Sequence, residues 1–198
     1  MQFLICVHII FAAQLVTARQ NYSQTAPFNL VISAPGRKIN GSYLTSCHEG
    51  AATEGLCLAS SSKISASIYN LNYTAENIAD FALGTVGILT WILPGIEFNL
   101  SSPMELNYSP TSNIAVPLFT PSETGTMIGF DEDEKMFIPS FVDDTKADIQ
   151  PYEDLYYRWF ICETYVGYKY TTLAWVLGKN SIPQNPTCQK VDVIKELF

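Results

Sequence analysis

Clusters of Pro, Gly, Ser and Asp divide this chain into short segments that are rich in branched and aromatic residues, such as Phe28–Ser33 (FNLVIS) and Ile114–Phe119 (IAVPLF). The segments recur roughly every 8–15 residues, the spacing of strands in antiparallel all-β domains. Asn40-Gly41 is the strongest short hairpin signal among them. No segment keeps a helical pattern over several turns, although single helical turns fit Glu76–Phe81 and Glu153–Tyr156. The sequence therefore predicts an all-β fold, an antiparallel β-sandwich or jelly roll, with a β-trefoil as the alternative.

The length and composition fit one folded domain. The 198 residues are 47% hydrophobic and 15% charged, which is typical of a globular chain with a sizeable core. We expect a signal peptide at 1–18, a short arm at 19–27 and a single all-β domain at 28–198. We also expect Phe28–Ser33 and Lys190–Lys195 in the sheet framework, so that the two ends of the domain pair.

The N-terminal stretch MQFLICVHIIFAAQLVTA has the organisation of a secretory signal peptide. Its apolar run extends from Phe3 to Val16, and the small-residue pattern at its end places cleavage after Ala18. The run is shorter than the ~20 residues of a comfortable membrane span, and no later segment has an apolar run long enough to cross. We therefore expect a secreted protein, located in the extracellular space or the cell wall, with no membrane partner.

The cysteine count agrees with export. Four cysteines remain after removal of the signal peptide: Cys47, Cys57, Cys162 and Cys188. An even number in an exported chain indicates two disulfides. Of the three possible pairings we predict Cys47–Cys57 and Cys162–Cys188, because each closes a local loop and would contribute roughly 3 and 3.5 kcal/mol by loop entropy. The CxxC spacing of a zinc site is absent, so we expect no zinc.

Five Asn-X-Ser/Thr sequons also favour export, and each predicts a glycosylated surface position. They begin at Asn21, Asn40, Asn72, Asn99 and Asn107. The last is the weakest, because Pro110 follows its Ser109.

The charge of the chain restricts its partners. A formal net charge of −8 argues against nucleic acid and against an anionic membrane, since both bind through clustered Lys and Arg. The acidic run FDEDEKMF, with Asp143, Asp144 and Asp148 after it, offers carboxylates for calcium. It lacks the Gly and the closing Glu of an EF-hand loop, so we interpret these groups as solvated turn acids. We expect no metal and no cofactor.

The stretch from Trp159 to Cys188 reads as a hairpin of two aromatic strands followed by a proline-containing loop. A two-residue turn at Val166-Gly167 would put Trp159 opposite Ala174. A three-residue loop would shift the register and pair Trp159 with Trp175 instead. The sequence leaves both registers open.

In the two-residue register, one side of the hairpin presents four aromatic residues: Trp159, Tyr165, Tyr168 and Tyr170. One interpretation is a second packed face, because Tyr and Trp bury well with only their polar tips in water. The other is a platform on which sugar rings stack. These four residues are the candidate ligand-binding set.

Candidate catalytic groups are few. The mature chain has one histidine, His48, which lies with Glu49 and Glu54 inside the small loop closed by the first predicted disulfide. A nucleophile–His–acid triad would have to use it, and no GxSxG elbow is present. Glu49 and Glu163 could act as a glycosidase pair if they lay ~5–9 Å apart. We interpret His48 and its neighbours as a self-stabilised loop and assign no catalytic residue.

Several stretches carry a resemblance to a known family. They are FNLV, NGSYLTSCHEGAATEGLCL, SNIAVPLFTP, IGFDEDEKMFI and WFICETYVGYKYTTLAWVLG…PQNPTCQKVDV. With them the mature chain, from Phe28 to Val193, resembles an uncharacterised family of small secreted fungal proteins. Its most specific part is TLAWVLGKNSIPQNPTCQKVDV. The resemblance implies an extracellular or cell-wall-associated domain and assigns no activity.

Together these features predict a secreted, non-catalytic, monomeric all-β domain that binds a cell-wall polysaccharide or an extracellular protein. Two alternatives stay open: an extracellular hydrolase acting on carbohydrate, and an effector-like protein that interacts with a host. A cluster of carboxylates in a cleft would favour the hydrolase, and an exposed row of Trp and Tyr would favour glycan binding.

Overall fold

A computed structural model describes residues 22–59, 66–74, 85–94, 99–149, 151–180 and 182–198. These residues form fifteen strands and no helix. The described part of the chain thus offers no helix long and apolar enough to cross a membrane. The strands are β1 Ser23–Gln24, β2 Phe28–Ser33, β3 Leu44–Gly50, β4 Thr53–Leu58, β5 Tyr69–Tyr73, β6 Val86–Pro94, β7 Asn99–Tyr108, β8 Ile114–Phe119, β9 Met127–Phe130, β10 Met136–Val142, β11 Pro151–Tyr156, β12 Trp159–Tyr165, β13 Lys169–Val176, β14 Gln189–Lys190 and β15 Asp192–Leu197.

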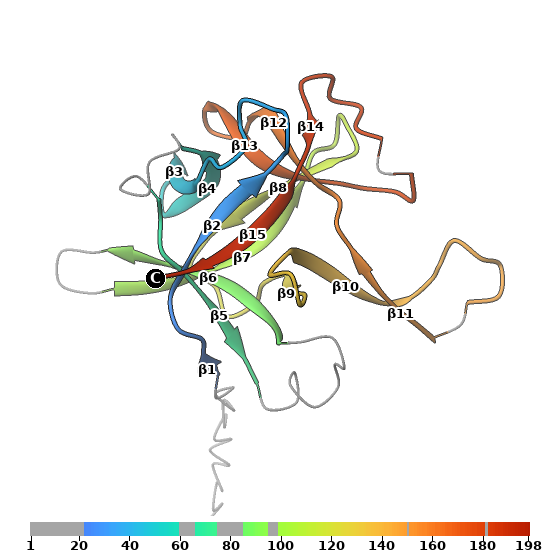
Figure 1. Cartoon of the computed structure of the whole chain (residues 1–198), viewed down its shortest axis with the longest axis horizontal. Coiled ribbons are helices and arrows are strands. Elements are labelled where there is room, and N and C mark those ends of the chain that lie inside the picture. Colours follow the sequence, from blue (N-terminus) through green and yellow to red (C-terminus); the bar gives the residue numbers. More distant parts are fainter. Residues whose placement is uncertain (1–21, 60–65, 75–84, 95–98, 150, 181) are drawn as a thin grey trace, which may run out of the picture.

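The strands make one continuous antiparallel sheet that curls around its own core (Figure 1). Its main path is β11-β10-β9-β6-β7-β8-β4-β13-β12-β14, and β5 carries β2 and β15 as a branch from β6. The curl depends on β7, which pairs with β6 through Pro103 and with β8 from Met104 onward. The all-β antiparallel prediction is confirmed. The layers of the domain are parts of one curled sheet.

The terminal strands pair as expected. β15 runs antiparallel to β2 in unbroken register, from Asp192 opposite Ser33 to Leu197 opposite Phe28. Strand β2 has the predicted bounds, and Phe28 and Leu30 on it are fully buried. The last strand of the chain therefore covers an edge whose side chains form the core.

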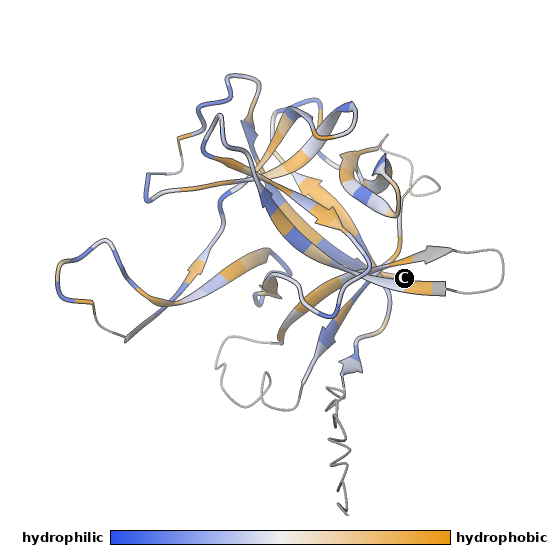
Figure 2. Cartoon of the chain, turned by 180° about the vertical axis from the view of Figure 1, so that it is seen from behind, coloured by the Kyte–Doolittle hydropathy of each residue, from blue (hydrophilic) through white to orange (hydrophobic). Residues whose placement is uncertain are grey.

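Large side chains from several strands fill this core. Tyr69 stacks on Phe119 with ring centroids 5.7 Å apart, and Trp159 meets Trp175 edge to face at 4.8 Å. Figure 2 shows hydrophobic residues concentrated on the curled strands and mainly hydrophilic residues in the loops. The tertiary contacts of the core thus link the beginning, middle and end of the chain.

Two local predictions differ from the structure. The turn at Asn40-Gly41 is wider than a tight hairpin: the Gly41 N–H donates to the carbonyl of Ile32, and Oδ1 of Asn40 accepts from the Ala34 N–H at 2.8 Å. The side chain of Asn40 thus ties the wider loop together, and Gly41 adopts a φ of 74°. The helical turn at Glu153–Tyr156 is wrong, because these residues pair with β10 as part of β11. The other one, at 76–81, lies outside the described residues.

Strands β10 and β11 continue beyond the body of the molecule as a two-stranded arm (Figure 1). β11 ends the path of the sheet and, among the described strands, pairs with β10 alone. Near the end of the arm Phe141, Val142 and Ile149 are exposed.

Candidate functional site

The β12–β13 hairpin has a three-residue tip. Cross-strand pairing is continuous from Trp159 opposite Trp175 to Tyr165 opposite Lys169, which leaves 166–168 as the loop. The two-residue turn is therefore wrong, and the alternative three-residue loop is confirmed. Because side chains alternate along a strand, this shift changes which residues share a face.

The structure separates the four aromatic residues that the sequence placed together. Trp159 is fully buried, and its Nε1 donates to the carbonyl of Met136 at 2.8 Å. Tyr165 and Tyr168 are 77% and 51% exposed. Tyr170 is half-buried, lies on the sheet face opposite to Tyr165, and contacts Tyr168 with ring centroids 6.1 Å apart. Trp159 is therefore part of the core, while the three tyrosines surround the hairpin tip.

Glu49 of β3 holds this tip in place. The side chain is 5% exposed, and its Oε2 accepts hydrogen bonds from the backbone N–H groups of Gly167 at 2.9 Å and Tyr168 at 3.0 Å. Bonds to a charged acceptor are stronger than neutral ones. A Cβ on Gly167 would overlap the carbonyl oxygen of Glu49, so this approach requires glycine. We call this contact the Glu49 clamp.

The second oxygen of Glu49 has a different environment. Oε1 is buried and has no hydrogen-bond partner within the described part of the chain. It faces Gly55 of the neighbouring strand β4, where an added Cβ would lie 3.4 Å from it. Strand β4 thus encloses the carboxylate from the side away from the hairpin.

His48 extends the aromatic surface of the tip. Its ring lies 5.9 Å from that of Tyr168, and its Nδ1 donates to Oε1 of Glu54 at 3.3 Å. His48 is exposed, whereas the side chain of Glu54 is mostly buried. His48, Tyr168 and Tyr170 therefore form a short row of rings that joins the tips of β3–β4 and β12–β13. We call this row, together with Tyr165 on the opposite face of the same hairpin, the tip surface.

The two carboxylates considered for glycosidase chemistry have separate roles. Glu49 is enclosed and engaged by backbone N–H groups. Glu163 is exposed on β12, and its Oε2 pairs with Nζ of Lys169 at 2.7 Å. Neither carboxylate stands in the open, paired arrangement that acid–base cleavage of a sugar bond uses.

Each hairpin that contributes to the tip surface carries a disulfide. Cys47 and Cys57 join the paired strands β3 and β4. Cys162 of β12 is bonded to Cys188, which lies just before β14. Both predicted pairings are confirmed. The cross-links restrict each hairpin a few residues from its tip.

The sequons have different exposures. Asn40 and Asn107 are exposed, and Asn72 is half-buried with its Oδ1 accepting from Nε2 of Gln24 at 2.9 Å. Asn99 is the first residue of β7, and Asn21 lies outside the described residues. Glycosylation at all five stays a prediction.

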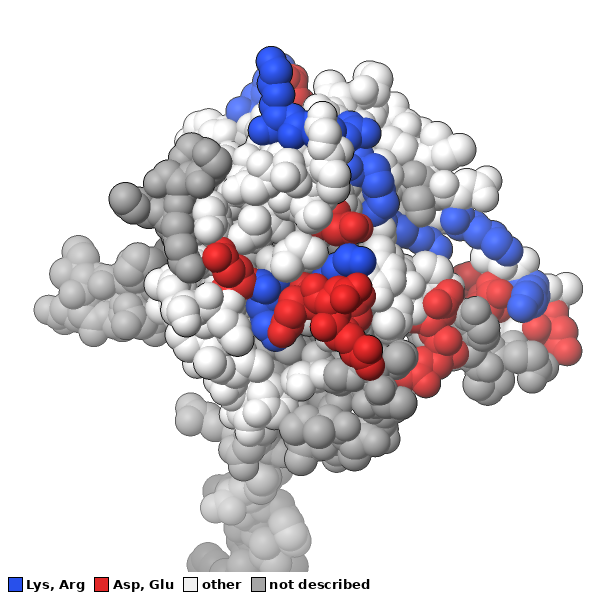
Figure 3. All heavy atoms as spheres, in the orientation of Figure 1, with Lys and Arg blue, Asp and Glu red and all other residues white. Residues whose placement is uncertain are grey.

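The acidic run after β9 is a structured turn. Oδ1 of Asp131 accepts from the N–H groups of Asp133 and Lys135, at 3.0 and 2.9 Å. Its Oδ2 accepts from the Tyr157 hydroxyl at 2.9 Å, and burial together with this hydrogen bond raises the pKa of Tyr157 to about 12. Figure 3 shows the acidic side chains gathered over this turn. Within the described ranges no three His, Cys, Asp or Glu side chains are grouped to hold a metal ion.

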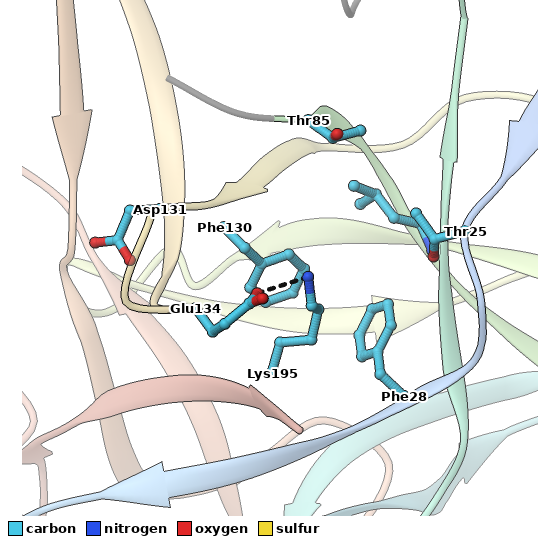
Figure 4. Close-up of a pocket in the computed structure, with 8 residues that line it drawn as sticks. Thr25, Phe28, Thr85, Phe130, Asp131, Glu134 and Lys195 are labelled. Carbon is cyan, nitrogen blue, oxygen red and sulfur yellow. Dashed lines mark hydrogen bonds and ion pairs between the residues drawn. The ribbon is translucent and has the colours of Figure 1, made fainter. Parts of the chain in front are cut away.

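A small pocket of about 160 Å³ lies beside the same turn (Figure 4). Phe28 and Phe130 line it, and Nζ of Lys195 lies 5.1 Å from the centroid of the Phe130 ring. Lys195 also pairs with Oε2 of Glu134 at 2.6 Å. Lys195 and Glu134 therefore satisfy each other, and Asp131 is engaged by the turn and by Tyr157, so we assign the pocket no ligand.

Comparison with known proteins gives a family. A family model described as a domain of unknown function (DUF7907) matches residues 25–197. The chain belongs to the DUF7907 family. No curated protein and no solved structure matches it. The DUF7907 match includes both disulfides, the Glu49 clamp and the tip surface.

The clamp of this DUF7907 domain is the feature of the candidate site that the sequence did not predict. Glu49 stood out as a neighbour of the histidine in a small disulfide loop and as a possible glycosidase carboxylate, not as a partner of the hairpin tip. Its partner Gly167 is 118 residues away. The one local signal was a glycine at the tip of an aromatic hairpin, which marks a close approach without naming the approaching group.

Proposed function

We propose that this domain is secreted and binds glycan without catalysis, through the tip surface formed by Tyr165, Tyr168, Tyr170 and His48. The observation that carries the proposal is the exposure of Tyr165 and Tyr168 on a tip that the Glu49 clamp holds in one position. Exposed tyrosine rings offer an apolar face and a polar hydroxyl, the two features that a sugar ring requires of its partner.

Rigidity supports this proposal. A loop that must become ordered on binding loses affinity through conformational entropy, whereas a loop that is already fixed does not. The clamp fixes the backbone on which Tyr168 stands, and the two disulfides restrict the strands behind it.

Charge also supports a neutral ligand at the tip. Lys169 pairs with Glu163, and His48 is hydrogen-bonded to Glu54. The leading apolar segment, the two disulfides and the resemblance to secreted fungal proteins support an extracellular setting. A cell-wall polysaccharide is therefore the ligand class we propose.

The test is a pull-down of the purified mature protein with insoluble polysaccharides, together with a glycan array. We expect Tyr165→Ala and Tyr168→Ala to lower retention, because each removes a stacking ring. Tyr108→Ala is the matched control, since Tyr108 is 60% exposed and lies on β7. Equal retention of the Tyr168 and Tyr108 variants would count against the tip surface. If the domain captures a protein but is not retained on any glycan, the proposed ligand would be a protein and not a glycan.

A further inference from the structure

A groove of about 510 Å³ is lined by the loop that connects β10 to β11 and by the end of β11, on a different element from the tip surface. Residues of the arm line it on one side, and Arg158 and Lys179 approach it from the segments before β12 and after β13. Figure 3 shows basic and acidic side chains next to each other over this part of the molecule. The volume is within the range of sites that hold one small ligand unit.

Two cations in this groove have no carboxylate partner among the described residues. Nζ of Lys179 donates a hydrogen bond to the hydroxyl of Thr145 at 3.4 Å. The Arg158 guanidinium carbon lies 4.3 Å from the centroid of the Tyr156 ring. Both cations line the same groove, in a chain whose net charge is −8.

The stacking of Arg158 on Tyr156 prepares the guanidinium for a planar anion. Contact with the ring restricts the orientation of the guanidinium plane. The N–H groups at the edge of that plane match the two oxygens of a carboxylate, which lysine cannot do. Lys179 adds a second positive charge to the same groove.

The groove also contains acceptors. Asp143 pairs with Lys146 at 3.3 Å and accepts from the Thr145 hydroxyl at 2.6 Å. Asp154 accepts from the Leu155 N–H through Oδ1. A phosphate group carries nearly two negative charges, so these carboxylates would repel it more strongly than the single charge of a ligand carboxylate. They also accept hydrogen bonds from sugar hydroxyls. Arginine, lysine and aspartate together therefore match a ligand that carries one carboxylate and several hydroxyls.

We propose that this groove binds a uronic-acid unit of an acidic polysaccharide, with Arg158 and Lys179 on the carboxylate and Asp154 and Thr145 on the hydroxyls. The proposal goes beyond neutral-glycan binding at the tip surface and does not rest on it, because the two sites share no residue.

The test is calorimetric titration of the mature protein with a galacturonic acid trimer and with a galactose trimer of the same length. We expect the acidic trimer to bind more tightly. Arg158→Lys keeps the charge but loses the paired hydrogen bonds, so it should weaken binding about tenfold. Lys179→Met should weaken binding several-fold. Lys38→Met is the control, because Lys38 is exposed and does not line the groove.

Several outcomes would overturn the proposal. Equal affinity for the two trimers would remove the role of the carboxylate. An equal loss in the Lys38 and Lys179 variants would indicate non-specific charge attraction. Displacement of the trimer by inorganic phosphate at equal concentration would indicate a general anion site. If Arg158→Lys lowers the melting temperature, its binding result is set aside. The affinity of the Lys179→Met variant then decides whether the groove binds the carboxylate. Tyr168→Ala should leave uronic-acid binding unchanged, so failure at the tip surface and failure at the groove are separate results.

Discussion

Glu49 and Tyr168 are 119 residues apart in the sequence, and a carboxylate oxygen of the first accepts a hydrogen bond from the backbone N–H of the second at 3.0 Å. The same oxygen accepts from Gly167 at 2.9 Å. Through this contact the tips of two hairpins, each with its own disulfide, form one unit. The tyrosines exposed at the junction depend on it for their position.

Glu49→Ala should lower the free energy of unfolding by about 2–4 kcal/mol, because two part-buried hydrogen bonds to a charged acceptor are lost. The check is urea unfolding together with amide exchange at Gly167 and Tyr168, which should become faster. Glu163→Ala is the control: it removes an exposed ion pair on the same hairpin and should cost less than about 1 kcal/mol. An equal loss of unfolding free energy in the two variants would contradict a special role for Glu49.

Gly167→Ala should separate the two tips, because the new Cβ would overlap the carbonyl oxygen of Glu49. Gly36→Ala provides the comparison. Gly36 has open space around it but a φ of 79°, so this change should cost only the about 1–2 kcal/mol of a strained backbone. We expect faster exchange of the Tyr168 amide in the Gly167 variant alone. If the Tyr168 amide stays protected from exchange in the Gly167 variant, the tip can shift without releasing Glu49.

Trp159→Ala should lower mainly the stability of the protein, whereas Tyr168→Ala should lower mainly its glycan binding. Trp159 is fully buried, so its truncation should cost about 3–5 kcal/mol in thermal unfolding. Tyr168 is 51% exposed, and its loss should cost less than about 1 kcal/mol while glycan retention falls. A large loss of stability in the Tyr168 variant would make the tip surface a structural element.

Deletion of 191–198 should prevent folding, because β15 covers the edge of β2 along its whole length. The deletion would expose backbone groups of β2 and side chains such as Phe28 and Leu30, which are fully buried. The measurement is the yield of secreted protein and its far-ultraviolet circular dichroism. Removal of Phe198 alone, which is 67% exposed, should leave both unchanged. Normal melting of the longer deletion would show that β2 is held without β15.

Thr145→Ala should raise the pKa of Asp143. The hydroxyl and the N–H of Thr145, with Lys146, lower the pKa of this carboxyl from 3.8 to about 2. A lowered pKa contributes stability above pH 3.8 that is lost as the pH falls toward 2. Titration of the carboxyl carbon by nuclear magnetic resonance measures the pKa directly. An unchanged pKa in the variant would assign the shift to the backbone N–H of residue 145 and to Lys146.

Local signals in the sequence were sufficient for the strands and for the disulfides. Branched and aromatic residues, followed by turn residues, set the bounds of Phe28–Ser33 without knowledge of any neighbour. Both disulfides close short stretches of chain, 10 and 26 residues apart, so loop entropy favours them over the longer pairings.

The sequence determined the all-β class, the pairing of the cysteines and the presence of an aromatic hairpin, because each depends on residues that are close together in the chain. The tertiary structure decided the register of that hairpin, since a carboxylate 118 residues away binds a three-residue tip. It also decided that Trp159 is buried, that Tyr168 is exposed, and that Arg158 and Lys179 share a groove. These features depend on contacts that form only when the sheet curls and brings distant strands together, and no local pattern encodes such contacts.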